Sequence, residues 1–516
     1  MFPGVVHRAH VRRWLLDLEW SDERLHLSDA VLTYTDADDV STEYDAGLDW
    51  AGSAPVDLDF GTVGEALSPS LTLWLPEIVD VAASVAAGYQ IPETRARLWL
   101  WLEGTTRRIL VADGYLDAAS YGGTGEPLTC SIRPMQRENV ALFPPELARI
   151  DAKTFPTSLT REHGIRYPWI IGQPGAGTVF VTPGIWAKWG ATDYLLIAGH
   201  EVAAGEVAVI NDSDQTTQAG LAVVEVADDR GRVVSLVALT GTAVTVSESA
   251  SYYVKWTTGG GYMRRGTLMT GLGDVLHWAL EQCGIPVDYR RVKGVTTYLN
   301  AWRLAGIIHA SPEQRIDMLD WIRSELLPLA PLSLLHGEDG LYPVVWPWGR
   351  TDAAIAADLD TARGDFERLG PIDYSARDAI RNEHRIAWGA GGANGNPASV
   401  TVITGDRDTT RNDTSAFLHS GSLASVTRYG RRVWEGSSAF VWDATTALRC
   451  IVWRAEAAAL PHRTVPVRLS DRFSGLVVGD VVRITDAATS LDAARGVIVS
   501  RPLTDGHWVD AVVRLS

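Results

Sequence analysis

The stretch RARLWLWLEG limits the possible folds more than any other segment of this 516-residue chain. Its centre is an unbroken alternation of leucine and tryptophan: Leu98, Trp99, Leu100, Trp101 and Leu102. Successive side chains of a strand point to opposite faces, so a strand here has two apolar faces, and both need to be covered. We therefore expect a closed barrel that packs against a neighbour.

Other alternating segments, divided by Gly, Pro, Asp and Ser clusters, extend this pattern along the chain. Near the N-terminus they are SLTLWLPE, RRILVADGYL and GEPLTCSI. A second group runs from RYPWIIGQPG through LAVVEVADDRGRVVSLVAL, where Asp228 to Gly231 has the composition of a hairpin turn. The chain ends in TVPVRLS, DVVRIT, RGVIVSRPL and WVDAVVRLS, which predict four strands, with a turn at Gly479 and Asp480.

The hydrophobic period changes to that of helices in three places. The first predicted helix has apolar residues at helical spacing, namely Leu272, Val275, Leu276, Ala279 and Leu280, and ends at Gly284 and Pro286. A second helix is predicted to begin with Ser311 as its cap, Pro312 in its first turn and Gln314 at capping-box spacing. The Ala-rich segment 442–460 predicts a third helix.

These patterns predict a mainly β, multidomain protein with an α+β middle. We assign residues 1–155 to a first β-barrel domain, 156–260 to an inserted small β domain, 261–378 to an α+β domain and 379–516 to a second β-barrel domain.

Composition excludes some classes of function. The formal charge of −17 disfavours a protein that holds nucleic-acid phosphates, because such binding uses clusters of Lys and Arg. Cys130, Cys283 and Cys450 are too far apart for a zinc site or a disulfide framework, so we expect buried free thiols. No apolar run is long enough for a membrane helix, so we expect a soluble protein without stable membrane insertion.

Candidate metal ligands are few. His7 and His10 have i, i+3 spacing but no further ligand cluster, and solvated terminal histidines are the favoured interpretation. His200 and Glu201 begin an HExxH-like motif, but Ala204 stands where its second histidine belongs. The acidic clusters at 35–39 and 211–214 lack the positions of an EF-hand, although a cation bound in one of these loops stays an alternative.

Two pairs of carboxylates are the best candidates for glycosidase chemistry: Asp317 with Asp320, and Glu338 with Asp339. Helix-surface charges and a hairpin tip, respectively, explain these pairs better. Ser375 and Ser420 are isolated serines outside any GxSxG motif. We therefore predict no catalytic, cofactor-binding or metal-binding residue and no enzymatic activity.

Several stretches, in order along most of the chain, resemble the tail baseplate hub proteins of long-tailed phages and gene transfer agents, which are similar to the trimeric hub of contractile-tailed phages. The stretches YDAGLDW and DGYLDAASYGGTGEPLTCSI resemble the first barrel of these hub proteins, and RYPWIIGQPG resembles the start of their inserted domain. Four stretches resemble the family's α+β middle, namely GLGDVLHWALEQCGIPVD, QRIDMLDWIRSELLP, GEDGLYPVVW and GDFERLGPIDYS. NEHRIAW, SVTRYGRR, WDATTALRCIVWRA and GLVVGDVVRITD resemble the second barrel.

The resemblance implies a homotrimer whose two barrels per subunit alternate in a pseudo-sixfold ring. That ring would connect the hexameric distal tail protein to a threefold tip, hold the C-terminal end of the tape-measure protein and carry tail fibre or tip proteins. DNA would pass through it in transit without specific binding. The protein would belong to the virion, after assembly in the host cytoplasm.

Twenty Trp with abundant Asp and Glu leave an alternative open, a carbohydrate-binding or cell-wall-degrading tail protein. For Trp50, Trp74, Trp99 and Trp101 we expect a mixture of core positions and subunit contacts, with the core favoured. Composition does not decide whether the loops between Gly389 and Asn412 contact a partner.

Overall fold

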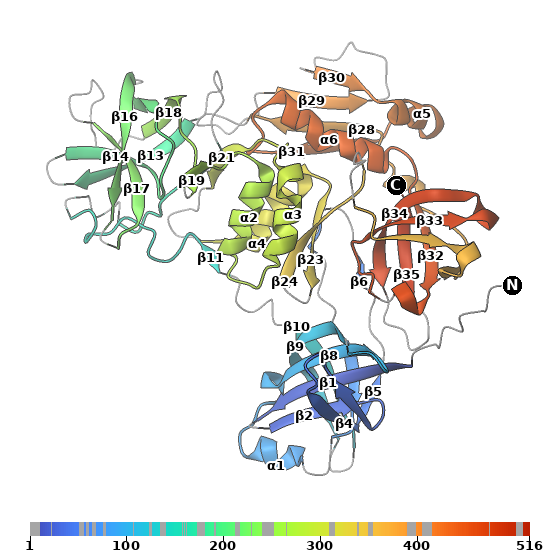
Figure 1. Ribbon diagram of the computed structural model, residues 1–516. Coiled ribbons are helices and arrows are strands. Elements are labelled where there is room, and N and C mark those ends of the chain that lie inside the picture. Colours follow the sequence, from blue (N-terminus) through green and yellow to red (C-terminus); the bar gives the residue numbers. More distant parts are fainter. Residues whose placement is uncertain are drawn as a thin grey trace.

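The computed structural model describes residues 11–515 except 22, 51–55, 58–60, 64–68, 76–78, 107, 123–125, 135–140, 157, 159, 161–162, 173–180, 190–191, 212–216, 229, 240–251, 265, 309–314, 338–339, 349–353, 390–398, 405–414, 474 and 502–508. The chain is mainly β, with few helices and several separate sheets, which confirms the predicted fold class (Figure 1). None of the helices in these residues is long and apolar enough to cross a membrane.

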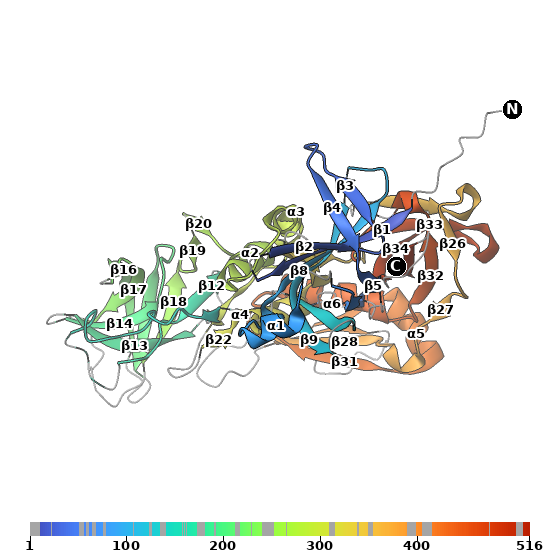
Figure 2. The ribbon, with the colours of Figure 1, turned by 90° about the horizontal axis from the view of Figure 1, so that it is seen from below.

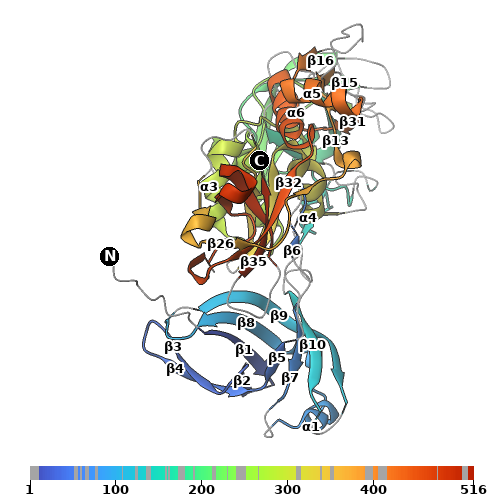
Figure 3. The same cartoon turned by 90° about the vertical axis from the view of Figure 1, so that its right-hand side faces the viewer.

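The first sheet has nine strands in the order β3-β4-β2-β1-β8-β9-β10-β7-β5 and curls around a leucine-rich core (Figure 3). The strands are β1 (Arg12–Trp20), β2 (Glu23–Ser28), β3 (Leu32–Thr35), β4 (Ser41–Ala46), β5 (Leu48–Trp50), β7 (Ser70–Leu73), β8 (Arg95–Leu102), β9 (Arg108–Tyr121) and β10 (Leu128–Pro134). Helix α1 (Val81–Ala86) and the 3-10 turn η1 (Ile91–Glu93) connect β7 to β8. The strands predicted in this region are confirmed.

Gly47 is the point at which this sheet closes on itself. Strand β4 pairs with β2, and β5 pairs with β7, so one nearly continuous segment joins both sides. The Gly47 N–H donates to the Ser28 carbonyl at 2.9 Å, and the Gly47 carbonyl accepts from the Trp74 N–H at 2.7 Å. A Cβ at this position would lie 2.3 Å from the Trp74 carbonyl oxygen, so only glycine permits the close approach.

Residues 29–46, which we call the arm, cover the outer face of this barrel. Strand β8 places Leu98 and Leu100 in the barrel core and Trp101 in a second cluster, which Tyr34 and Tyr44 of the arm complete. Both faces of β8 are therefore covered, as predicted. Trp101 is buried within its own chain, as favoured from the sequence, and the hairpin of the arm covers it.

The inserted domain is a closed barrel in the order β13-β14-β17-β16-β15-β18, far from the first barrel in Figure 1. Its strands are β13 (Val181–Trp189), β14 (Thr192–Ala198), β15 (Glu206–Asn211), β16 (Thr217–Ala227), β17 (Val233–Ala238) and β18 (Tyr252–Thr258). The predicted hairpin turn is confirmed, since the Asp228 N–H donates to the Arg232 carbonyl at 2.7 Å between β16 and β17. Two strands, β12 (Trp169–Gly172) and β21 (Ala305–Ile308), pair at its base.

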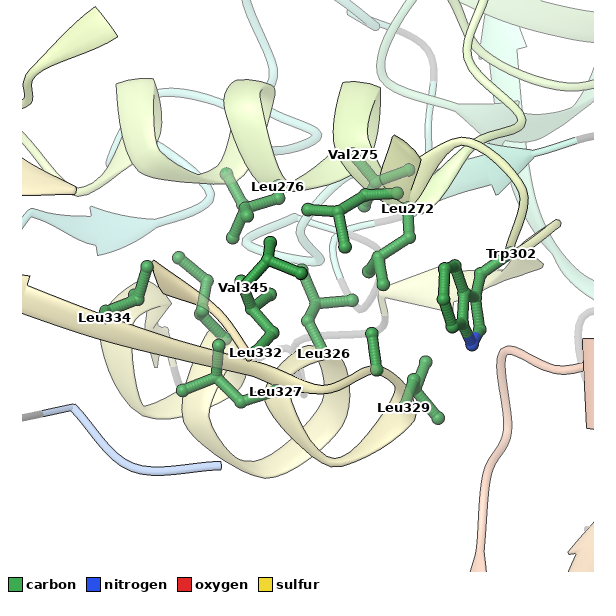
Figure 4. Close-up of a cluster of buried hydrophobic side chains, with 14 of the residues drawn as sticks. Leu272, Val275, Leu276, Trp302, Leu326, Leu327, Leu329, Leu332, Leu334 and Val345 are labelled. Atoms are coloured by element: carbon green, nitrogen blue, oxygen red, sulfur yellow. The ribbon is translucent and has the colours of Figure 1, made fainter. Parts of the chain in front are cut away.

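The α+β middle packs two helices over a hairpin. Its elements are α2 (Leu272–Gln282), α3 (Tyr289–Leu299), α4 (Met318–Trp321), the π-helical turn η4 (Ile322–Leu326), the 3-10 turn η5 (Leu327–Leu329), β23 (Leu332–Gly337) and β24 (Gly340–Val345). Side chains from α2, from the η4 and η5 turns and from both strands of the hairpin meet in one cluster (Figure 4). The five apolar positions predicted to face inward on α2 are all fully buried, which confirms this helix.

The start of the second predicted helix is wrong. The helix begins at Met318, and Asp317 caps it by accepting from the N–H groups of Leu319 and Asp320. Before it, β22 (Ile316–Asp317) pairs with β11 (Leu142–Phe143). The positions predicted as the cap and first turn, Ser311, Pro312 and Gln314, lie outside the described residues.

The C-terminal part contains two sheets. One has the order β25-β33-β34-β35-β32-β26, with β27 added to β32, and comprises β25 (Ala357–Asp360), β26 (Phe366–Arg368), β27 (Asp373–Tyr374), β32 (Arg463–Leu469), β33 (Val481–Asp486), β34 (Leu491–Arg501) and β35 (Val509–Leu515). The four predicted C-terminal strands are thereby confirmed. The two outermost strands β25 and β26 follow each other in sequence, and the Asp365 N–H donates to the Asp360 carbonyl at 3.1 Å between them, so the sheet curls into a barrel-like shape around its own core.

The other sheet has four strands and two helices. Its order is β30-β29-β28-β31, with β28 (Glu383–Trp388), β29 (Ser399–Thr404), β30 (Ser415–Leu418), β31 (Val433–Ser437), α5 (Ser420–Tyr429) and α6 (Ala444–Ala458). Helix α6 confirms the predicted Ala-rich helix. Because β25 to β27 pair with the C-terminal strands, we propose that the boundary of the α+β domain lies before Ala357.

Strand β33 follows the predicted turn, in which Gly479 has a φ of +95°. It lies between β25 and β34, so neighbours within the chain occupy both its edges. Another subunit therefore cannot add to this strand by backbone pairing.

A segment from the first barrel attaches to the rest of the chain. Strand β6 (Val56–Asp57) pairs with β34, and Val63 forms a parallel bridge with Leu334 of β23. The Gly61 N–H donates to the Leu332 carbonyl at 3.1 Å. These bonds tie the loop between β5 and β7 to both the α+β middle and the C-terminal sheet.

Candidate subunit interface

The carboxylates considered for catalysis have structural roles where they are described. Asp317 is the helix cap, and Asp320 is exposed and pairs with Arg323 at 3.0 Å. Glu338 and Asp339 lie outside the described residues, as do His7 and His10. Asp320 is thus a surface charge of the helix, as favoured from the sequence, whereas Asp317 is its N-cap, a role that the sequence interpretation did not assign.

His200 is a buried structural residue. Its Nε2 accepts from the Ile170 N–H at 2.9 Å, which places the proton on Nδ1, 2.7 Å from the Glu201 carbonyl. Burial lowers its pKa to about 4, so the ring is neutral near pH 7. The ring packs against Trp169 and Tyr262, and this aromatic group joins the inserted barrel to helix α2.

The other candidate residues that the structure describes are not grouped into a metal site or a catalytic site. Among the described residues no group of three or more His, Cys, Asp or Glu could hold a metal ion. Asp36 forms the turn at the tip of the arm by accepting from the N–H groups of Asp38 and Val40. Ser375 accepts from the His462 N–H at 3.1 Å, and Ser420 is exposed in the first turn of α5. The three cysteines are buried and free, as predicted.

The four tryptophans occupy different environments. Trp101 is buried and Trp99 is partly buried, whereas Trp74 is 50% exposed. The side chain of Trp50 lies outside what the structure describes. Trp101 is therefore in the core, and a subunit contact of the exposed Trp74 stays a prediction.

A polar cluster around Asp17 fixes the arm to the barrel. Asp17 accepts from the Tyr44 hydroxyl at 2.7 Å and from the Trp99 Nε1–H at 2.8 Å, and the Nδ1 of His26 lies 2.8 Å from its carboxylate. Arg108 donates to Asp17 at 3.2 Å and to the Tyr44 hydroxyl at 2.7 Å. The arm is thus held by directional bonds as well as by apolar contact.

Electrostatics keeps Asp17 ionised. Burial alone would raise its pKa, but the hydrogen bonds from His26 and Tyr44 and the charge of Arg108 outweigh burial and hold the pKa below its ordinary value. The Arg108 guanidinium also lies over the Trp99 ring, 4.0 Å from its centroid. The cluster therefore contains an ion pair, between Asp17 and Arg108, at the base of the arm.

The arm ends in an exposed, acidic sheet edge. Among the described residues, β3 has one strand partner, β4. Val31, just before β3, and Val40, just before β4, are 78% and 57% exposed. Residues 29–46 contain no Lys or Arg and six carboxylates, namely Asp29, Asp36, Asp38, Asp39, Glu43 and Asp45.

A second exposed edge, which itself carries Glu435, begins beside a group of arginines. Among the described residues, β31 pairs only with β28, and Val433 at its start is 36% exposed. Arg428 lies in the last turn of α5, and Arg377 donates to the Tyr429 carbonyl at 3.2 Å, while Arg431 and Arg432 stand just before β31. We call these four side chains the arginine patch, in which Arg431 is paired with Glu383. The guanidinium carbons of Arg377 and Arg428 each lie 6.0 Å from the Tyr429 ring centroid, and no described carboxylate forms an ion pair with either.

Sequence reasoning missed the arm and its cluster. A weak signal was present in RRWLLDLEW, where Asp17 and Glu19 each stand between apolar neighbours, but the stretch does not distinguish the two carboxylates. The residues that bind Asp17 are 9 to 91 positions away in the chain, and a single sequence does not show which of them meet.

No protein-family model matches the chain, and neither does any curated protein. Among solved structures, it is similar to the tail protein from Neisseria meningitidis, at 12% identity over 97% of this chain and 96% of that chain, with a TM-score of 0.36. It is also similar to the 43 kDa tail protein of prophage MuSo2 from Shewanella oneidensis, at 11% identity over 98% of both chains, with a TM-score of 0.34. A chain from the virion of a native gene transfer agent particle matches at 15% identity over 48% of this chain and 79% of that chain, with a TM-score of 0.19. These neighbours are tail and virion proteins, and at such identities and TM-scores the likeness assigns no function to this chain.

Proposed function

We propose that the chain is a structural subunit of a phage tail, the hub at the tail tip. In this proposal it is non-enzymatic and forms a homotrimeric ring between the hexameric distal tail protein and a threefold tip. The ring contacts the C-terminal end of the tape-measure protein and carries fibre or tip proteins. The protein resides in the virion after assembly in the host cytoplasm.

The observation that carries this proposal is the presence of two barrel-like sheets, one near each end of the chain, in addition to the closed barrel inserted between them. Each sheet surrounds its own apolar core, so each is a self-contained unit. Three copies supply six such units, the number needed to match a sixfold tube. The segment through β6 and Val63 ties the first barrel to the rest of the chain, which favours a fixed arrangement of these units.

The charge of the chain suits a conduit through which DNA passes. In a chain of formal charge −17, the proposal includes an acidic lumen surface, which would repel phosphates and not retain them. The proposal accordingly includes no specific nucleic-acid binding.

Co-assembly tests the proposed position. The purified chain is mixed with the distal tail protein hexamer and the complex is viewed by electron microscopy. We expect one threefold ring of this chain at one end of each hexamer. Absence of any complex at concentrations where both proteins are oligomeric would contradict the proposed position.

The carbohydrate-binding alternative has one observation in its favour, the half-exposed ring of Trp74. Binding to a glycan array that Trp74→Ala abolishes would support it. A blank array for the wild-type trimer would remove it.

A further inference from the structure

We propose that the exposed edge of β3 in one copy of the chain adds to the exposed edge of β31 in a second copy. In this contact the carboxylates of the arm face the arginine patch. The inference rests on the proposed oligomeric ring and names the surfaces that join its subunits.

The two edges have similar lengths, and each is open to a second strand partner. β3 has four residues and β31 has five, and each has one strand partner among the described residues. An exposed strand edge offers a row of N–H and C=O groups to another chain, and adding a strand satisfies them. The contact would also remove Val31, Val40 and Val433 from water.

Charge selects this pairing from other edge contacts. In a chain of formal charge −17, two copies repel each other in general, so a contact between copies needs a local reversal of sign. The arginine patch provides such a reversal beside β31, and the arm provides carboxylates without any Lys or Arg. Complementary charges of this kind fix which surfaces meet and raise the rate of association.

The positions of the two edges exclude a contact within one chain. The arm lies on one side of the molecule, and α5 with β31 lies on the opposite side, in both Figure 2 and Figure 3. The contact is therefore head-to-tail between different copies. A head-to-tail contact gives a ring when the rotation closes and a filament when it does not.

Charge reversal on each surface, separately and together, tests the contact in the full-length chain. Asp38→Lys with Glu43→Lys reverses the arm, and Arg377→Glu with Arg428→Glu reverses the patch. These four side chains are exposed, so the variants should fold. At low ionic strength we expect each reversal to weaken self-association by at least about tenfold in sedimentation velocity. Combining both reversals in one chain should restore it, because each interface is then complementary again.

Matched controls reverse exposed charges elsewhere. Glu93→Lys with Glu126→Lys controls for the arm, and Arg290→Glu with Arg449→Glu controls for the patch, and both should associate like the wild type.

A wild-type trimer that neither reversal weakens would overturn the contact and leave the proposed ring intact, whereas a monomeric wild type would refute the ring itself. Loss of DNA binding in the patch variant, with unchanged self-association, would overturn the contact and assign the patch to nucleic acid.

Discussion

Replacing Asp17 by Asn should loosen the arm. The substitution keeps the shape but removes the charge and places an NH2 group among the donors of Tyr44, Trp99 and Arg108. A hydrogen bond to a charged group contributes about 1.5 to 3 kcal/mol, and the side chain is 16% exposed, so we expect a loss of about 2 kcal/mol. That loss corresponds to an about 30-fold larger population of the open arm.

Hydrogen exchange of the arm amides, followed by mass spectrometry, measures this opening directly. We expect about 30-fold faster exchange across residues 29–46 in Asp17→Asn. The matched control is Asp49→Asn, which is exposed on β5 in the same barrel and should exchange like the wild type. Equal exchange in the two variants would refute the role given to Asp17.

The difference in arm opening between Asp17→Asn and the wild type should also depend on pH. Because the pKa of Asp17 is lowered in the folded protein, its stabilisation is complete above the ordinary value of 3.8 and is lost as the pH falls below it. The difference between Asp17→Asn and the wild type should therefore be constant near pH 7 and narrow below pH 3.8. A difference that grows on acidification would contradict this assignment.

Three further outcomes are expected. Gly47→Ala should lower the free energy of unfolding by about 1 to 3 kcal/mol in urea titrations, because its Cβ meets the Trp74 carbonyl, whereas Gly294→Ala in open space on α3 should raise it by up to about 1 kcal/mol. Glu383→Gln should cost about 3 kcal/mol at pH 7, because Arg385 and Arg431 lose their buried partner. Despite burial, hydrogen bonds and charge from these arginines lower the pKa of Glu383 to about 2, so this cost should shrink as the pH falls from 4.5 toward 2. Burial raises the pKa of Cys130 and Cys283 to about 12, so thiol reagents should label them only after denaturation, and rapid labelling of the native protein would contradict their burial.

Most helices and strands could be predicted because their hydrophobic periodicity is written in neighbouring residues. The spacing of Leu272, Val275 and Leu276 specifies one face of α2, and alternation from Leu98 to Leu102 specifies a strand with two buried faces. Pairing across the chain has no such signal. Strands β25 to β27 pair with residues of the C-terminal sheet that lie 89 to 125 positions later, and neither their length nor their composition indicates this partner.

The start of the helix at Met318 also does not follow from the sequence. Ser311 and Pro312 offer a cap signal as strong as that of Asp317, and only the pairing of β22 with β11 decides between them.

The candidate interface does not follow from the sequence either. Acidic residues near Asp36 were visible in the sequence, but their position on a sheet edge depends on Tyr34 and Tyr44 packing against the barrel.

The proposed trimer, in which the barrel-like units near the two ends of each chain form the ring, is tested most directly by the mass of the purified protein in solution. Multi-angle light scattering should give three times the chain mass of 56.1 kDa, and the trimer should persist on dilution. A mass of 56.1 kDa at every concentration would contradict the account.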